Sequence, residues 1–393
     1  MYKYCEKCLY DTNHPLGLFV NKIECSGCET HKEKDQLDWE NRRSELELEL
    51  KKYKKNNSKY DCVVPVIGDA EDFYTLSKVI ELGLVPLVVC VNDYFKNDIG
   101  WHNLHQLITY FDVDSFVFNP DIFTYKELIK TSLQKYNHIL LPFLQLHTAF
   151  PTHIAYERKI PLVIWGQNQP VEQVGKFSHL DATQMSRWSR REHDLFKTEI
   201  DELMGNGAQV NSRNIAYYDY PSVSSLGKRG IKGLYLSNYF RWDPLKQNKS
   251  VTSYGFKPES NNCSFDIYER AGSSVYYNIH DILKFKRTGY RKIRDHLVRE
   301  IRHARVSKTE AKKIEDFYSS KSVNIKPFFD WLGVSKSGYD WFCKHRLNDV
   351  KQLICEDNNE TENITLPHDI TKNLNKSYKS RSEYILFDKG IDI

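Results

Sequence analysis

The chain has 393 residues, of which 40% are hydrophobic, 27% charged and 13% aromatic. The aromatic content excludes a disordered chain, and the same composition excludes collagen-like, coiled-coil and low-complexity classes. A net charge of +4 is too small to indicate a nucleic-acid partner by itself. A prior of about 150 residues per domain predicts two or three domains.

The first cysteines of the chain predict a metal site. Cys5, Cys8, Cys25 and Cys28 form two C-x-x-C pairs separated by 16 residues, whereas the other five cysteines are scattered. In a reducing compartment this spacing is typical of a tetrahedral zinc site. Four thiolates leave no open coordination position, so the zinc would be structural and not catalytic. A pair of redox dithiols is the alternative.

After this knuckle, short apolar runs alternate with helical patterns. The predicted helices span residues 38–53, 71–82, 101–111 and 123–136, and the predicted strands span residues 61–67, 85–91, 115–118 and 161–165. Strands that alternate with helices of about ten to fifteen residues predict βαβ crossovers and a two-faced parallel sheet, and therefore an α/β fold. Beyond about residue 180 the pattern becomes mostly helical and aromatic.

Parallel sheets bind ligands beyond the carboxyl ends of their strands. Chemistry is therefore expected in the loops that begin at Gly68, Asn92 and Gly166. The expected regions are a zinc knuckle (1–35), an α/β domain (36–200), a substrate or partner region (201–350) and a tail (351–393). The tail is rich in Asn, Lys, Ser and Asp, so we expect it to be loosely ordered.

No apolar run approaches the length of a membrane span. The longest runs, such as residues 85–91, have about seven residues, whereas a spanning helix needs about 20. The first five residues are Met-Tyr-Lys-Tyr-Cys, without the apolar segment of a signal peptide. We therefore expect a cytoplasmic protein with no membrane partner.

Basic residues are concentrated in one segment. Residues 284–313 contain twelve Lys or Arg and three Asp or Glu. The segment fits binding to the phosphates of a nucleotide-sugar, binding to RNA, or a solvated helical face.

A series of motifs between residue 1 and about residue 350 follows the order and spacing of one known family. They are the four-cysteine knuckle, Asp38-Trp39, residues 60–64 (YDCVV), 160–168 (IPLVIWGQN), 230–243 (GIKGLYLSNYFRWD), His280-Asp281 and residues 344–346 (KHR). Together they resemble the N-acetyl sugar amidotransferases of surface-polysaccharide and flagellar-sugar biosynthesis, including the pseudaminic acid and O-antigen types. The resemblance implies a Rossmann-like sheet of the PP-loop ATP pyrophosphatase (HUP) type, with a zinc knuckle and a mostly helical C-terminal region.

The resemblance also implies a two-stage reaction. ATP, with magnesium, adenylylates an acetamido oxygen of a nucleotide-activated sugar, and ammonia then displaces AMP to leave an acetamidino group. The ammonia would come from a separate glutaminase subunit, because the chain shows no recognisable glutaminase nucleophile motif. The implied cofactors are structural zinc, ATP and magnesium, and the implied partners are the glutaminase and the nucleotide-sugar.

Ten positions outside the knuckle take functional roles by this resemblance. They are Gly68, Asp69 and Asp72 in the phosphate loop, Asp93 near the adenosine, Gln167, Asn168 and Asp295 as catalytic residues, and Asn238, Arg241 and Trp242 as contacts to the nucleotide-sugar. Arg241 suits a diphosphate because its planar fork binds bidentately. Core packing is the alternative role of Trp242, and loop capping is that of Asn168 and Asn238.

The phosphate loop departs from the family pattern. Where the family has Ser-Gly-Gly-x-Asp-Ser, this chain has Ile67-Gly68-Asp69-Ala70-Glu71-Asp72, so only the first glycine is retained. In such a loop, backbone N–H groups at a helix N-terminus cradle the phosphates. Nearby carboxylates repel a polyphosphate by on the order of 1 kcal/mol per close pair, unless magnesium bridges them.

Three functions stay open at this point. The first is an active amidotransferase with an altered loop. The second is a catalytically silent paralogue that binds the nucleotide-sugar or the glutaminase. The third is a PP-loop tRNA-modifying enzyme, which would need residues 284–313 to form a continuous basic patch interleaved with exposed aromatic residues.

Overall fold

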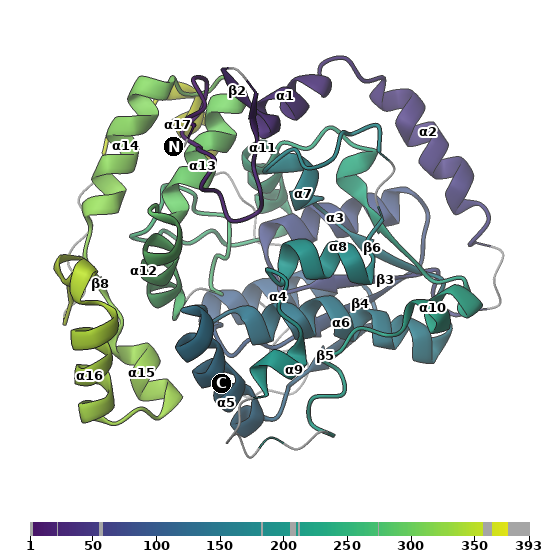
Figure 1. The fold of residues 1–393 in the computed structure, drawn as a ribbon. Coiled ribbons are helices and arrows are strands. Elements are labelled where there is room, and N and C mark those ends of the chain that lie inside the picture. Colours follow the sequence, from purple (N-terminus) through teal and green to yellow (C-terminus); the bar gives the residue numbers. More distant parts are fainter. Residues whose placement is uncertain are drawn as a thin grey trace.

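The computed structural model describes residues 3–21, 23–54, 58–181, 184–204, 210, 213–273, 275–356 and 364–375. Its centre is a five-stranded parallel sheet (Figure 1). The strands are β3 (Cys62–Val66), β4 (Pro86–Val91), β5 (Ser115–Phe118), β6 (Leu162–Trp165) and β7 (Lys232–Tyr235). They lie in the order β5-β4-β3-β6-β7. This is the 3-2-1-4-5 order of doubly wound sheets, which confirms the predicted α/β, Rossmann-like fold.

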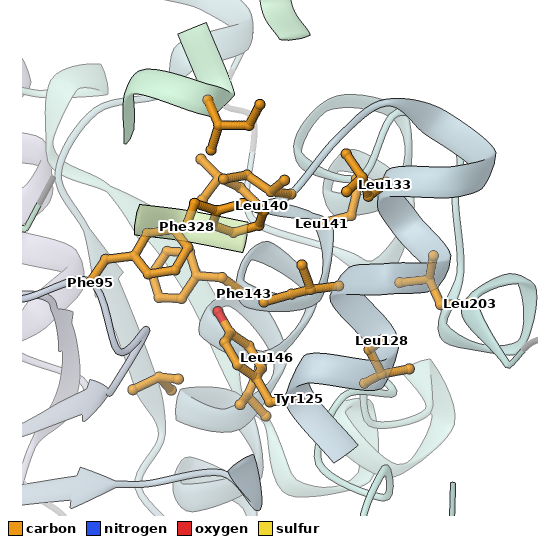
Figure 2. Packing of buried hydrophobic residues seen from close by; sticks show 14 of the residues in the cluster. Phe95, Tyr125, Leu128, Leu133, Leu140, Leu141, Phe143, Leu146, Leu203 and Phe328 are labelled. Carbon is orange, nitrogen blue, oxygen red and sulfur yellow. The ribbon is translucent and has the colours of Figure 1, made fainter. Parts of the chain in front are cut away.

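Helices cover both faces of the sheet. Residues of β3 alternate between the faces, since Val63 joins one core cluster and Val64 joins the other. The first face packs against α5 (Ile122–Tyr136) and α6 (Leu141–Arg158), and Figure 2 shows apolar side chains of these helices in one cluster that also includes Phe328 of a C-terminal helix. The other face packs against α2 (Trp39–Leu50), α3 (Ala70–Glu81) and α4 (Asp98–Tyr110).

The sheet opens between its two central strands. The β3–β6 ladder pairs Cys62 with Leu162 and Val63 with Val163 and goes no further. Pro65 follows in β3, and a proline has no N–H to donate to a ladder. The order of the strands also reverses here, so β3 and β6 diverge at the switch point where doubly wound folds bind ligands.

Two elements of the sheet region are absent from the sequence predictions. The helix α6 is apolar around most of its circumference, so its sequence carries no 3.6-residue periodicity. The strand β7 has only four residues and lies beyond the boundary expected at residue 200, so the sheet extends into the region predicted to be helical.

The knuckle lies against the rest of the chain through short elements. It comprises β1 (Val20–Asn21), β2 (Glu24–Cys25) and α1 (Ser26–Glu33), and it contacts α7 (Gln169–Glu172) just after β6. The remaining helices of the middle region are α8 (Arg187–Ser189), α9 (Ile200–Leu203), α10 (Val223–Arg229) and α11 (Pro244–Ser250).

The C-terminal region is mostly helical, as predicted. Its elements are α12 (Tyr277–Thr288), α13 (Lys292–Arg302), α14 (Lys308–Ser320), β8 (Val323–Asn324), α15 (Lys326–Leu332), α16 (Lys336–Arg346), β9 (Ile354–Cys355) and α17 (His368–Leu374). Part of the expected tail is therefore ordered, because α17 contacts α11 and buries Ile370. Residues 357–363 and 376–393 of that tail lie outside the described residues.

Among the described residues, the longest apolar helical stretches fall short of what a bilayer crossing needs.

Docking of the knuckle requires a glycine at position 175. Gly175 has φ +60°, and a Cβ there would lie 2.3 Å from the carbonyl oxygen of Ser26. We expect Gly175→Ala to lower the free energy of unfolding by about 2 to 4 kcal/mol, measured by urea denaturation, because both the backbone and the contact are strained. Gly227→Ala is the matched control. Nothing lies within 4 Å of its Cβ, and it stands inside α10, so it should raise stability by up to about 1 kcal/mol. Equal stability of the two variants would contradict the docking geometry.

Candidate functional site

The four cysteines of the knuckle come together in an arrangement that could hold a metal ion. Their sulfur atoms all lie within 4.8 Å of one another, with Sγ of Cys5 and Cys28 at 3.9 Å and Sγ of Cys8 and Cys25 at 3.7 Å. Zinc–sulfur bonds of about 2.3 Å in a tetrahedron require sulfur separations of about 3.8 Å, whereas a disulfide requires about 2 Å. The arrangement therefore fits zinc, held by Cys5, Cys8, Cys25 and Cys28.

The loop after β3 is organised around one carboxylate. Oδ2 of Asp72 accepts hydrogen bonds from the backbone N–H groups of Ile67 (2.7 Å), Gly68 (2.9 Å) and Asp69 (2.9 Å). Gly68 has φ +91°, a left-handed conformation that turns the loop back over the helix. Backbone N–H groups at the start of a helix can hold an anion, and here these three hold the carboxylate of Asp72 in the first turn of α3.

The other two acids of the loop also bind backbone amides. Asp69 caps α3 through the N–H of Ala70 (2.8 Å), and both of its carboxylate oxygens lie 3.0 Å from the N–H of Arg270. Oε1 of Glu71 accepts from the N–H of Gln167 (2.8 Å) in the loop after β6. The acids thus tie the β3 loop to the two segments that face it.

Burial shifts the pKa values of these carboxyls upward. Burial raises the pKa of Asp72 to about 6, although the three N–H groups oppose the shift. Burial raises the pKa of Glu71 to about 8 against the opposing hydrogen bond from Gln167. Near neutral pH, Asp72 is therefore the anion in the cradle and Glu71 is mostly a neutral acid.

The neutral form of Glu71 predicts a pH-dependent stability. Its pKa in the unfolded chain is near 4.5 and in the folded chain about 8, so the folded state binds the proton more tightly and stability falls as pH rises between these values. We expect Glu71→Gln to gain about 2 to 4 kcal/mol relative to the wild type between pH 5 and pH 8.5. Urea denaturation at several pH values measures this difference. Parallel pH profiles for the two proteins would contradict it.

At the end of β4, Asp93 is fully buried, and its carboxylate contacts other groups of the protein. Its Oδ1 accepts from the N–H of Phe95 (3.0 Å) and lies 3.3 Å from Nζ of Lys96. Its Oδ2 faces Nη1 of Arg270 at 3.8 Å. The neighbourhood of Asp93 is therefore a packed ion cluster that lines neither of the cavities described next.

Two adjoining cavities lie beyond the carboxyl ends of β3 and β6. The large cavity has a volume of about 560 Å³ and the small cavity about 320 Å³. They share wall residues that include Glu71, Asp72, Gln167, Arg270, Lys292 and Asp295. The large cavity has the size of a typical small-molecule site.

The sequence-predicted residues divide between these cavities and the interior. Asp72, Gln167 and Asp295 line both cavities, and Asp69 lines the small one. Asp295 accepts from the hydroxyl of Tyr10 (2.8 Å) and pairs with Lys284.

The three residues expected to contact the nucleotide-sugar, and Asn168 among the expected catalytic residues, line neither cavity. Trp242 is fully buried against Tyr74, as core packing requires. Asn168 and Asn238 are buried and hydrogen-bonded to each other (3.2 Å), and Arg241 pairs with Asp35 outside both cavities.

The basic segment mostly faces inward. Arg291 is fully buried and donates a hydrogen bond to Asp281. The large cavity is lined by Lys284, Arg287 and Lys292. The small cavity is lined by Arg299 and Arg302. The segment therefore does not form the continuous outer patch that RNA binding would need.

Sequence reasoning missed Arg270, His147 and Tyr277 as cavity residues. Arg270 stands in a segment without regular secondary structure, and His147 is on the unpredicted α6. Polar residues recur at helical spacing along residues 277–288, and this pattern could have predicted that one side of α12 lines a cavity.

Comparisons with known proteins give no family. No protein-family model matches the chain, and no curated protein matches it. Among solved structures, the chain is similar to an NMN synthetase from Francisella tularensis, with 12% sequence identity over 52% of this chain and 94% of that one and a TM-score of 0.29. A likeness of this size assigns neither an activity nor a ligand to this chain.

Proposed function

We propose that this protein is a catalytically silent relative of the N-acetyl sugar amidotransferases, which binds a nucleotide-activated sugar and does not turn over ATP. The observation that carries the proposal is the Asp72 carboxylate, which accepts three backbone N–H groups of the loop. ATP would have to displace this carboxylate before its phosphates could reach the same donors.

The displacement is costly. Hydrogen bonds to a charged group contribute about 1.5 to 3 kcal/mol each, so three of them amount to several kcal/mol, and the burial cost that raises the pKa of Asp72 offsets part of this sum. A penalty of about 4 kcal/mol weakens binding roughly a thousandfold. Asp69 and Glu71 are held by Arg270 and Gln167, so magnesium could recruit them only by breaking those hydrogen bonds as well.

The cavities support the binding half of the proposal. The large cavity combines aromatic rings, such as those of Trp165 and Tyr277, with the charged groups of Arg270, Arg287 and Lys292. A nucleotide-sugar offers rings for the aromatic walls and phosphates for the cations. An active amidotransferase supplied with ammonia by a glutaminase is the competing function, and it would require Asp72 to leave the loop.

A turnover assay separates the two functions. The purified chain is mixed with ATP, magnesium and a panel of UDP-, GDP- and CMP-linked N-acetyl sugars, and AMP and pyrophosphate are measured. We expect no AMP above the protein-free control, and binding of at least one member of the panel by calorimetry. Sugar-dependent AMP formation would overturn the silent assignment. Failure of every panel member to bind would overturn the assignment as a nucleotide-sugar binder.

A further inference from the structure

The geometry points to a phosphoryl-binding site on the inner face of α12, formed by the guanidinium groups of Arg270 and Arg287 beside His280. The site rests on the proposed function, because it is where the diphosphate of the bound nucleotide-sugar would lie. The expectation from sequence gave this role to Arg241, which lines neither cavity.

The helix α12 turns a polar face toward the large cavity. Tyr277, His280, Lys284 and Arg287 are spaced by three or four residues, so they share one side of the helix, and all four line the cavity. The opposite side carries Ile279, Ile282 and Leu283, which are fully buried in the core. A helix between a core and solvent ordinarily shows its polar face to bulk water, whereas this one shows it to an internal space.

Two cations in this wall lack a closely bonded carboxylate. Lys284 is neutralised by its pair with Asp295. Arg287 donates to the carbonyl oxygen of Asn137 and has no carboxylate within ion-pair distance among the residues described. For Arg270, the nearest carboxylate oxygen of its ion pair with Asp93 is 3.8 Å away, beyond hydrogen-bond length. A guanidinium group that is not hydrogen-bonded to a carboxylate can bind a phosphate group through two of its N–H donors.

The position of Arg270 is imposed by the loop. Its φ of +55° is a left-handed conformation, uncommon for a residue with a side chain. The Asp69 carboxylate holds the Arg270 N–H in that conformation, and the guanidinium lies 5.8 Å and 5.3 Å from the ring centroids of Phe143 and Tyr277. Asp69 is therefore a positioning residue, and the family's glycine at this position could not make the same contact.

His280 lies in the same cavity wall as these cations. Its side chain is buried, and Nδ1 has no hydrogen-bond partner among the described residues. Burial lowers the pKa of His280 well below its usual range, and the neighbouring His138 and the charges of Arg287, Arg270 and Lys284 lower it further. The charged side chains that lower this pKa include Arg270 and Arg287, the two guanidinium groups of the proposed site.

Calorimetry with inorganic pyrophosphate on the full chain tests the site. We expect Arg270→Gln and Arg287→Gln each to weaken pyrophosphate binding at least tenfold, and Asp69→Asn to weaken it less, because the side chain of Arg270 remains. Lys286→Gln is the matched control: it removes one positive charge from the same helix, but Lys286 pairs with Asp349 and lies outside the cavity. Its affinity should stay within twofold of the wild type. Circular dichroism checks that each variant is folded. If Arg287→Gln does not fold, Arg287→Lys replaces it as a milder change at the same position.

Two results would overturn the site: no pyrophosphate binding to the wild type, or equal affinity in the Arg270→Gln, Arg287→Gln and Lys286→Gln proteins. Both results concern pyrophosphate affinity, whereas the silent assignment fails only if AMP is formed. The two failures are therefore distinguishable. AMP formation in the turnover assay would remove the silent assignment and leave the pyrophosphate comparison valid.

Discussion

Removal of zinc is expected to lower the melting temperature of the protein by more than about 10 °C. The knuckle buries few apolar residues besides its cysteines, namely Tyr10, Leu18 and Val20, together with residues from three other segments. A lobe of this size cannot hold its fold without a cross-link or a metal. Differential scanning calorimetry with and without a chelator, together with the zinc content of the purified protein, measures the effect.

The effect should reach beyond the knuckle. Arg302 lies 3.6 Å from the sulfur of Cys25 and also donates to the carbonyl oxygens of Glu172 and Gln173, next to the small cavity. Cys8→Ser removes one of the four sulfur ligands, so it should reproduce the loss of melting temperature seen with the chelator. Cys343→Ser, at a partly exposed and unclustered cysteine, should change the melting temperature by less than about 2 °C. A purified protein without zinc and with an unchanged melting temperature in Cys8→Ser would contradict the metal site.

Replacement of Asp72 by alanine is expected to lower the free energy of unfolding by about 2 to 4 kcal/mol. The substitution leaves the N–H groups of Ile67, Gly68 and Asp69 without the acceptor that all three share. Water entering from the cavities recovers part of this loss, which limits the upper value. Urea denaturation in phosphate-free buffer at pH 7.5 is the measurement.

Asp72→Asn separates the charge from the shape of the side chain. The amide oxygen can still accept hydrogen bonds, and the neutral side chain avoids the burial cost that raises the pKa of Asp72 to about 6, so we expect Asp72→Asn to keep more of the wild-type stability than Asp72→Ala. If both variants were as stable as the wild type, the carboxylate would not be the organising group of the loop.

The parts of the fold that could be predicted are those with a strong local pattern. The strand at 85–91 and the helix at 71–82 are found within one residue of β4 and α3, because an apolar run or an amphipathic period is a local property. The helix α6 and the strand β7 depend on burial from all sides and on pairing with β6, which are tertiary effects.

The candidate site divides in the same way. The cysteine spacing was sufficient to predict that the four thiols come together, because the ligand geometry of a C-x-x-C pair acts over short distances. The sequence also showed that the loop after β3 is acidic, but it could not show where each acid would find a partner. The partner of Asp69 is 201 residues away, and that of Glu71 is 96 residues away. Contacts over such separations are fixed by the fold and not by the motif.

The position of the Asp72 carboxylate is tested most directly by a pH titration of backbone amides by NMR. The amide resonances of Ile67, Gly68 and Asp69 should shift together with a midpoint near pH 6, since one carboxylate accepts from all three. The common transition should disappear in Asp72→Asn, and the resonances of the wild type should not respond to ATP and magnesium at pH 7.5. Amides that ignore pH between 4 and 8 but shift when ATP and magnesium are added would mean that the cradle is open to phosphate.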